Sequence, residues 1–231
     1  MKIIHSSILA AALAVLASGS TAATLTYNGL AGYGSATVDS NPVGGTDHFS
    51  GTAGSFKMGD AGNVLGLGTS FIAFCLDLTG TIQTNKEYVI NNVNPYQTAR
   101  QLTAMQRTNV EMLFDAAYGM VNVYDNTDAA AFQLALWEAG YETDAGALSL
   151  TSGTRVGTAN AAILARANVF LASMTTWDGT DNYNTYFLDA ADEARQDLVT
   201  AAVVPLPAAG LMLIGGLGAL GALRRRKKKS A

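Results

Sequence analysis

Cysteine is almost absent from this chain: of its 231 residues, only Cys75 carries a thiol. A single cysteine excludes an internal disulfide and a cysteine-based zinc cluster. Three roles are open for it: a reactive thiol, a link to another molecule, or a small buried apolar side chain. The surrounding stretch, AFCLDLTG, is mostly apolar and strand-like, which favours a buried position.

Histidine and cationic residues are scarce between residues 24 and 204. The only histidine there is His48, in a stretch rich in Gly, Ser and Thr, so histidine-based acid–base chemistry and histidine-rich metal sites are nearly excluded. Seven Lys and Arg residues stand against eighteen Asp and Glu residues, a net charge of −11. Such a surface repels phosphate backbones, so nucleic-acid binding is not expected. No histidine-centred or clearly paired carboxylate group is visible, and we expect neither an enzyme nor a cofactor.

Both ends of the chain carry targeting features. Residues 1–23 combine an early lysine, an apolar stretch and small residues suited to cleavage, which is typical of a secretory signal peptide. Residues 208–223 are uncharged and precede six consecutive cations. As a helix they rise roughly 24 Å against the ~30 Å hydrocarbon core, so we expect a short transmembrane helix with the cations on the cytoplasmic side. The alternative is a soluble core helix.

The segment 203–231 resembles a known sorting signal. A VPLPA motif precedes the glycine-rich apolar span and the arginine cluster, an order similar to the VPLPA variant of the PEP-CTERM signals of Gram-negative bacteria. The motif residues are Val204, Pro205, Leu206, Pro207 and Ala208. The resemblance implies an exosortase-type protease as partner, transient anchoring in the inner membrane through residues 208–223, and delivery to the outer surface or extracellular matrix. A degenerate LPxTG sortase signal, with alanine in place of threonine, ranks second.

Residue periodicity predicts strands first, then helices, then two final strands. The expected strands lie within residues 24–58, as short strands joined by glycine turns, and at 69–78, 80–84, 86–93, 186–191 and 195–204. Residues 69–78 are apolar on both alternating faces, which places Cys75 in a central strand. We therefore expect one α+β domain over residues 24–202: an antiparallel β-sandwich or barrel-like sheet with a helical insertion.

Three stretches have helical periodicity. The first begins at a capping box from Thr103 to Gln106, the second is capped by Thr127 or Asp128, and the third spans residues 158–177. The expected buried faces are Met105, Val110, Leu113, Phe114 and Ala117 in the first, and Ile163, Ala167, Phe170, Leu171 and Met174 in the third. The DNTD run before the second lacks the glycine and distant glutamate of an EF-hand loop, so we interpret it as a turn and helix cap, with a calcium site of another type as the alternative.

The second helix carries a glutamine on its apolar face. Phe132, Leu136 and Trp137 recur at helical spacing, and Gln133 lies in the same stripe one turn before Trp137. Burying the three apolar side chains contributes roughly 1.5–3 kcal/mol each, whereas an unpaired buried amide costs about 1–3 kcal/mol. Gln133 is therefore expected to be buried and hydrogen-bonded, either to a backbone group or to Cys75.

A thiol and a carboxamide held together in a dry setting can lose ammonia and form an internal thioester, an electrophile that reacts with amines. The stretches FCL at Cys75 and FQLALW at Gln133 resemble the Cys and Gln motifs of bacterial surface thioester domains, over roughly residues 70 to 175. The resemblance implies a Cys75–Gln133 cross-link that serves adhesion. The side chains expected to pack around it are Phe74, Phe132, Leu136 and Trp137.

Two positions depart from those motifs. Phe132 stands where Thr or Ala is usual, and Asp77 occupies a usually apolar position. Asp77, Glu138 and Glu142 are nearby candidates for proton transfer, with solvated or capping roles as the alternative. We expect an exported surface or matrix protein whose thioester captures an amine-bearing surface protein or matrix polymer. The rival is a structural or carbohydrate-binding matrix protein that has the fold without the bond.

Overall fold

The computed structural model describes residues 22–40, 48–78, 80–92, 102–144, 146, 148–192 and 194–205. Its elements are β1 (Ala22–Ser40), β2 (Phe49–Gly59), β3 (Ser70–Cys75), β4 (Lys86–Ile90), α1 (Ala104–Ala117), a 3₁₀ turn (Tyr118–Met120), α2 (Asn126–Tyr141), β5 (Arg155–Ala159), α3 (Ala161–Thr175), β6 (Tyr183–Ala190) and β7 (Leu198–Val203). Within this part of the chain, no helix has both the length and the apolarity to cross a membrane. The expected transmembrane helix at 208–223 lies outside it, as do residues 1–21 of the expected signal peptide.

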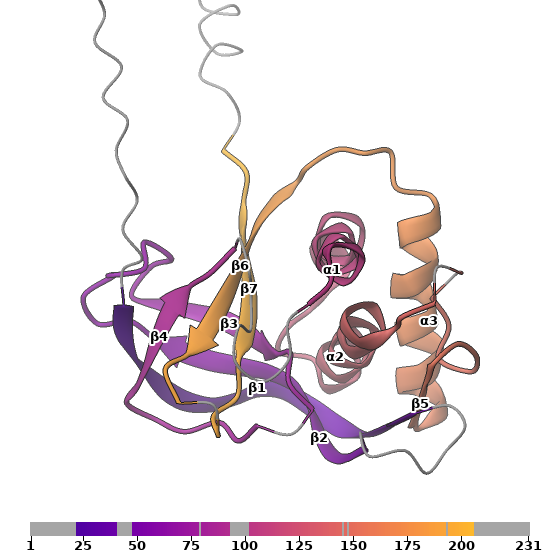
Figure 1. The fold of residues 1–231 in the computed structure, drawn as a ribbon, viewed down its shortest axis with the longest axis horizontal. Coiled ribbons are helices and arrows are strands. Elements are labelled where there is room, and N and C mark those ends of the chain that lie inside the picture. The colour runs from indigo at the N-terminus through magenta and orange to yellow at the C-terminus, as the bar shows by residue number, and fades with distance from the viewer. Residues whose placement is uncertain are drawn as a thin grey trace, which may run out of the picture.

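The long strand β1 closes the sheet. Its first residues pair with β4, its middle with β2 and its last five residues with β5, all antiparallel. The order β2-β3-β7-β6-β4-β1 then returns to β2, which gives the barrel-like form of the expected antiparallel sheet and not the sandwich (Figure 1). Short strands over residues 24–58 were the wrong expectation. The chain passes through its glycines as two long strands, and β1 bends at register shifts on either side of Leu30, where Gly29 has a φ of +94°.

Other strands differ in detail from the expectation. β5 was not predicted, and the expected strand at 80–84 is only an isolated bridge between Thr81 and Arg195. β3 ends at Cys75, although the apolar run continues through Leu76 and Leu78. β3 lies between β2 and β7, so the central position expected for Cys75 is confirmed, at the carboxyl end of its strand.

The helical insertion lies between β4 and β6. α1 begins at the predicted capping box of Thr103 and Gln106. Met105 was placed wrongly in its buried face: it is 36% exposed, while Gln106 points inward and donates from Nε2 to the carbonyl of Glu142 at 3.3 Å. The predicted buried face of α3 is confirmed at all five positions.

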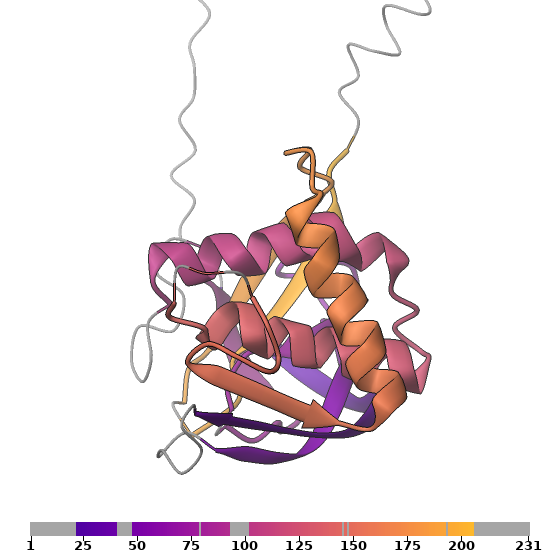
Figure 2. The same cartoon turned by 90° about the vertical axis from the view of Figure 1, so that its right-hand side faces the viewer.

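α2 is the central helix of the domain. Every residue from Ala129 to Tyr141 is buried, a wider burial than the predicted stripe, as expected for a helix that is apolar all round. It packs against β1 and β2 and is covered by α1 and α3 (Figures 1 and 2). Its cap is Asp125, two residues before Thr127 and three before Asp128, the two predicted caps. A glycine is needed opposite this cap, since a Cβ on Gly32 would lie 2.6 Å from the carbonyl oxygen of Asp125.

Candidate functional site

Cys75 and Gln133 meet where β3 ends against α2. Cys75 is the last residue of β3, pairs with Leu198 of β7 and is 2% exposed. Gln133 lies two turns into α2 and is completely buried. The sequence expectation that Gln133 is buried with a partner is confirmed, and the structure shows the backbone alternative: the hydrogen bonds of the amide go to the N–H and carbonyl of Cys75.

The Gln133 carboxamide is held at both ends by Cys75. Its Oε1 accepts from the Cys75 N–H at 2.9 Å, and its Nε2 donates to the Cys75 carbonyl at 2.6 Å. Both hydrogen bonds are buried, where an unmade bond would cost about 1–3 kcal/mol. The amide thus takes the place of a neighbouring strand at the end of β3. It is fixed against the residue that carries the only thiol of the chain.

The thiol of Cys75 is protonated at neutral pH. Burial is the main cause that raises its pKa well above the ordinary value, followed by the charge of Asp77. Sγ donates to the carbonyl oxygen of Asp77 at 2.7 Å, and the indole N–H of Trp137 lies close enough to the sulfur to lower the pKa in part. Any nucleophilic role of this sulfur therefore begins with loss of a proton.

An aromatic cluster is built on Phe74 and Phe132, the residues directly before Cys75 and Gln133. The Phe132 ring lies 4.9 Å from Phe74, 5.2 Å from Phe114 and 5.8 Å from Phe170, centroid to centroid. Phe74, Phe132, Leu136 and Trp137, the four expected packing residues, are at most 1% exposed. Phe132, which departs from the resembling motif, joins β3, α1 and α3 at this point through its ring contacts.

Two residues that the sequence analysis missed, Asp197 and Tyr88, lie beside the thiol. The Asp77 carboxylate accepts from the Asp197 N–H at 2.7 Å, and Asp197 accepts from the Ala190 N–H at 2.7 Å. Burial, then the charge of Asp77, raises the pKa of Asp197 to about 8. Tyr88 is fully buried, and burial followed by Asp197 and Cys75 raises its pKa. Asp197 is therefore a neutral acid at neutral pH, close to the sulfur.

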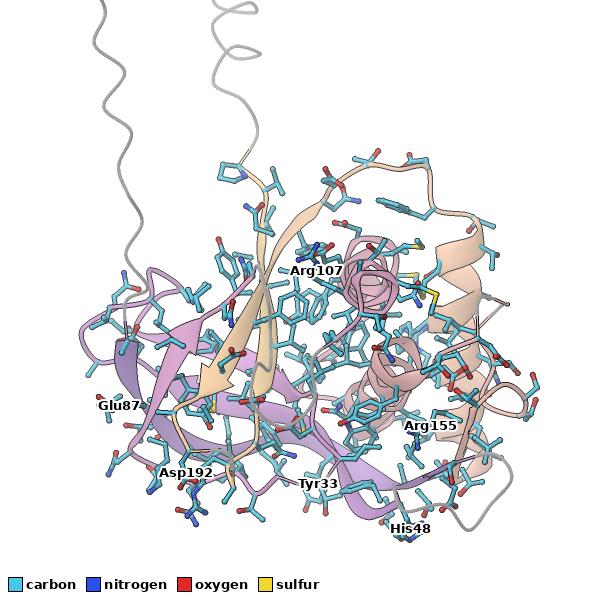
Figure 3. The ribbon with its side chains drawn as sticks, in the orientation of Figure 1. Tyr33, His48, Glu87, Arg107, Arg155 and Asp192 are labelled. Carbon is cyan, nitrogen blue, oxygen red and sulfur yellow. The ribbon has the colours of Figure 1, made fainter. Side chains whose placement is uncertain are left out.

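The other two proton-transfer candidates have structural roles. Glu138 accepts from the Ser149 N–H at 2.8 Å, and burial raises its pKa to about 8. Although burial acts to raise the pKa of Glu142, hydrogen bonds from Thr154 and neighbouring N–H groups lower it overall. Both carboxyls hold the connection from α2 to β5, beside Arg155 (Figure 3).

The remaining sequence features lie away from this pair. His48 pairs with Asp39 at the outer end of the β1–β2 ribbon (Figure 3). Asp125 caps α2 and Asp128 accepts from Arg166 at 2.7 Å, so the DNTD run acts as a turn and helix cap. Among the described residues, no group of three His, Cys, Asp or Glu side chains could hold a metal ion. Of the sorting motif, Val204 and Pro205 follow β7, and residues 206–208 lie outside the described part.

Comparisons with known proteins give loose structural likenesses. No protein-family model matches the chain, and no curated protein does. The chain is similar to the N-terminal domain of the Streptococcus pyogenes pilus tip adhesin Cpa, with 14% identity, 74% of this chain and 94% of that chain covered, and a TM-score of 0.42. It is also similar to the N-terminal thioester domain of a surface protein from Clostridium perfringens, with 16% identity, coverages of 74% and 99%, and a TM-score of 0.36.

A third likeness is to the N-terminal thioester domain of fibronectin-binding protein SfbI from Streptococcus pyogenes. Identity is 12%, coverages are 74% of this chain and 94% of that chain, and the TM-score is 0.36. TM-scores this low decide nothing about the chemistry of Cys75 and Gln133. That chemistry is judged from the contacts of the two side chains.

Proposed function

We propose that Cys75 and Gln133 condense to an internal thioester, and that the domain uses it to bind covalently to an amine on a surface protein or matrix polymer. One observation carries the proposal: the Gln133 amide is bound at both ends to the backbone of Cys75 inside a dry core. The Cys75 side chain branches from the Cα atom that lies between the bonded N–H and carbonyl, so the thiol is attached close to the bound amide. To form the bond, Sγ would leave the Asp77 carbonyl and turn toward the amide carbon by rotation about χ1.

The chemistry balances with the groups present. Sγ attacks Cδ of Gln133, the C–S bond forms, the C–N bond breaks, and Nε2 leaves as ammonia with the thiol proton. The Cys75 N–H, 2.9 Å from Oε1, donates to the oxygen that becomes negative in the tetrahedral intermediate. A primary amine later attacks the same carbon and returns the thiol. The bound partner stays attached after one reaction, so the domain acts as an adhesive and not as an enzyme.

Intact mass under denaturing conditions tests the bond. The full chain is expected about 17 Da below its sequence mass because ammonia is lost, and methylamine is expected to add about 31 Da at Gln133. Cys75→Ala, which keeps the backbone groups that bind Gln133, is the matched control and should show the full mass and no methylamine adduct. Full sequence mass in the unsubstituted protein, with an alkylatable Cys75, would refute the thioester.

A second candidate is a carbohydrate-binding matrix protein in which Gln133 only caps β3. A hollow of about 540 Å³ beside α1 and β6 is lined by Tyr183, Tyr186 and the amides Asn92 and Asn184, together with acidic side chains. Aromatic rings and amides of this kind suit a sugar. Polysaccharide binding that is lost in Tyr186→Ala and unchanged in Cys75→Ala would favour this candidate.

The terminal segments complete the first proposal. Residues 1–23 would direct export, residues 208–223 would anchor the chain transiently in the inner membrane of a Gram-negative bacterium, and an exosortase-type protease would act at the VPLPA motif before delivery to the outer surface or matrix. The support is the order of motif, apolar span and cations. Deletion of residues 206–231 in the host should move the protein from the cell surface to the periplasm or medium; unchanged surface display would contradict this role.

A further inference from the structure

Trp137 lies beside the reacting pair with its polar atom inward. It follows Gln133 by one helical turn on α2, and side chains four residues apart share a helix face. The side chain is 1% exposed, and its ring is 4.6 Å from the Phe49 ring of β2, centroid to centroid. From the sequence, Trp137 was expected only to pack around the pair. Its contacts give it a further role.

The indole Nε1–H is an unused donor. It is buried without a hydrogen-bond partner in the part of the chain that the structure describes. The atom that it approaches is the sulfur of Cys75, whose pKa it lowers. The N–H acts on the sulfur without meeting the geometry of a hydrogen bond, while the thiol itself donates to the Asp77 carbonyl. A buried N–H without an acceptor costs about 1–3 kcal/mol, so its position needs a reason.

We propose that the Trp137 indole N–H is the donor that stabilises the negative charge on Cys75 Sγ when the thioester opens. This inference rests on the proposed function. An amine nitrogen attacks Cδ of Gln133, and the C–S bond breaks with its electron pair on sulfur. The thiolate accepts from Nε1–H and then takes the proton that the attacking nitrogen loses, leaving an amide and a thiol. The indole N–H gains its acceptor only when the sulfur becomes negative, and an interaction that forms only as charge develops lowers the barrier of the reaction.

The other ionisable groups around the sulfur do not stabilise that charge. Asp77 follows Cys75 in the chain, Asp197 precedes β7, and both raise the pKa of the thiol. Tyr88 reaches the same region from β4, where Cys75 and the two carboxyls act to raise its pKa. Of the groups that act on the thiol as hydrogen-bond partners, Trp137 and the Asp77 carbonyl, only Trp137 donates. Removal of this donor should therefore have an effect that neighbouring side chains do not replace.

The test removes the N–H and keeps the ring. In the full chain, Trp137 is replaced by 3-benzothienylalanine, which has sulfur in place of the N–H, and in parallel by Trp137→Phe. The methylamine reaction is expected to slow about 10- to 100-fold, as for loss of a hydrogen bond to a charged group. The pH midpoint for alkylation of Cys75, in the methylamine-opened protein, is expected to rise by about one pH unit.

The control is Phe49→Leu, which disturbs the packing of the indole and keeps its N–H. It should leave the alkylation midpoint unchanged. A benzothienylalanine variant with the rate and midpoint of the unsubstituted protein would overturn the role of Trp137. A mass about 17 Da below the sequence value, the ammonia lost on thioester formation, would leave the proposed function standing. If the unsubstituted protein holds no thioester, the proposed function fails. The contact between Trp137 and the sulfur can still be tested on the free thiol: an alkylation midpoint that is the same in the benzothienylalanine variant and the unsubstituted protein would refute it.

Discussion

Methylamine is expected to destabilise the domain without any mutation. In the proposed thioester form, the bond joins β3 to α2; after methylamine has reacted, Cys75 would be a thiol and Gln133 would carry a methylamide. The loss between these two states is the cross-link. The hydrogen bond from Gln133 Nε2 to the Cys75 carbonyl is absent from both, because Nε2 leaves as ammonia when the thioester forms, so it distinguishes the adduct only from a protein with the unreacted amide.

The cross-link term comes from the unfolded chain. Cys75 and Gln133 are 58 residues apart. Treated by the chain-entropy relation used for disulfides, closing a loop of this length stabilises the folded state by about 4 kcal/mol. Opening the bond returns that entropy to the unfolded state.

The hydrogen-bond term comes from amide geometry. A primary amide can face the Cys75 N–H and carbonyl with its oxygen and one hydrogen on the same side, as Gln133 does. In a trans secondary amide the substituent occupies that side. The adduct must either adopt the cis form, at about 2.5 kcal/mol, or leave the buried Cys75 carbonyl unpaired, at about 1–3 kcal/mol. A captured partner therefore prevents Gln133 from returning to its place on Cys75.

Urea unfolding of one preparation before and after methylamine measures the cross-link term, an expected loss of about 4 kcal/mol in the free energy of unfolding. Cys75→Ala isolates the hydrogen-bond term, because it lacks the cross-link and keeps both hydrogen bonds. The adduct should be less stable than this variant by about 1–3 kcal/mol. Equal stability of adduct and variant would refute the amide-geometry argument. Equal stability of adduct and thioester form would refute the cross-link term.

Three further predictions concern the fold. Gln133→Leu should be less stable than Cys75→Ala by about 2–5 kcal/mol in urea unfolding, because only the former leaves a buried N–H and C=O unpaired. Glu138 and Asp197 have folded pKa values raised to about 8, so the folded state holds protons that the unfolded state releases. The free energy of unfolding should fall from about pH 4.5 to about pH 8, by up to about 1.4 kcal/mol per pH unit for each carboxyl. The fall should be less steep in Glu138→Gln. A free energy of unfolding that rises over this range would contradict the raised pKa values of the two carboxyls. Gly32→Val should lower the melting temperature, because its Cβ would lie 2.6 Å from a backbone oxygen ahead of α2.

Much of the site follows from local sequence. The helical spacing of Phe132, Gln133 and Trp137 predicts that Gln133 is buried, and the apolar run at Cys75 predicts a central strand; both are confirmed. The burial of each residue is predictable because the helix and strand periods fix which side chains share a face. The error at Met105 arises at a helix end, where the capping box turns Gln106 inward instead.

The surroundings of the thiol depend on the topology and were not predictable in this way. Asp197 comes near Cys75 because β7 inserts between β3 and β6, and Tyr88 because β4 pairs with β6 and β1. Both residues are far from Cys75 in sequence, and no local period relates them to it. The only sequence signal for Asp197 was its position directly before the apolar run that begins at Leu198, and this pattern is too common to indicate a site.

Asp77, the departure from the resembling motif, is expected to slow the reaction of the proposed thioester. Its charge raises the pKa of the Cys75 thiol, while its carboxylate accepts from the Asp197 N–H at 2.7 Å. A negative neighbour makes the thiolate a poorer leaving group and does not act on the uncharged thioester. Asp77→Asn keeps an acceptor for that N–H and removes the charge, so the methylamine reaction should run about tenfold faster. The control is Asp192→Asn, an exposed carboxyl paired with Arg195, which should leave the rate unchanged. A rate equal to or below that of the unsubstituted protein would show that the charge at Asp77 does not restrain the bond.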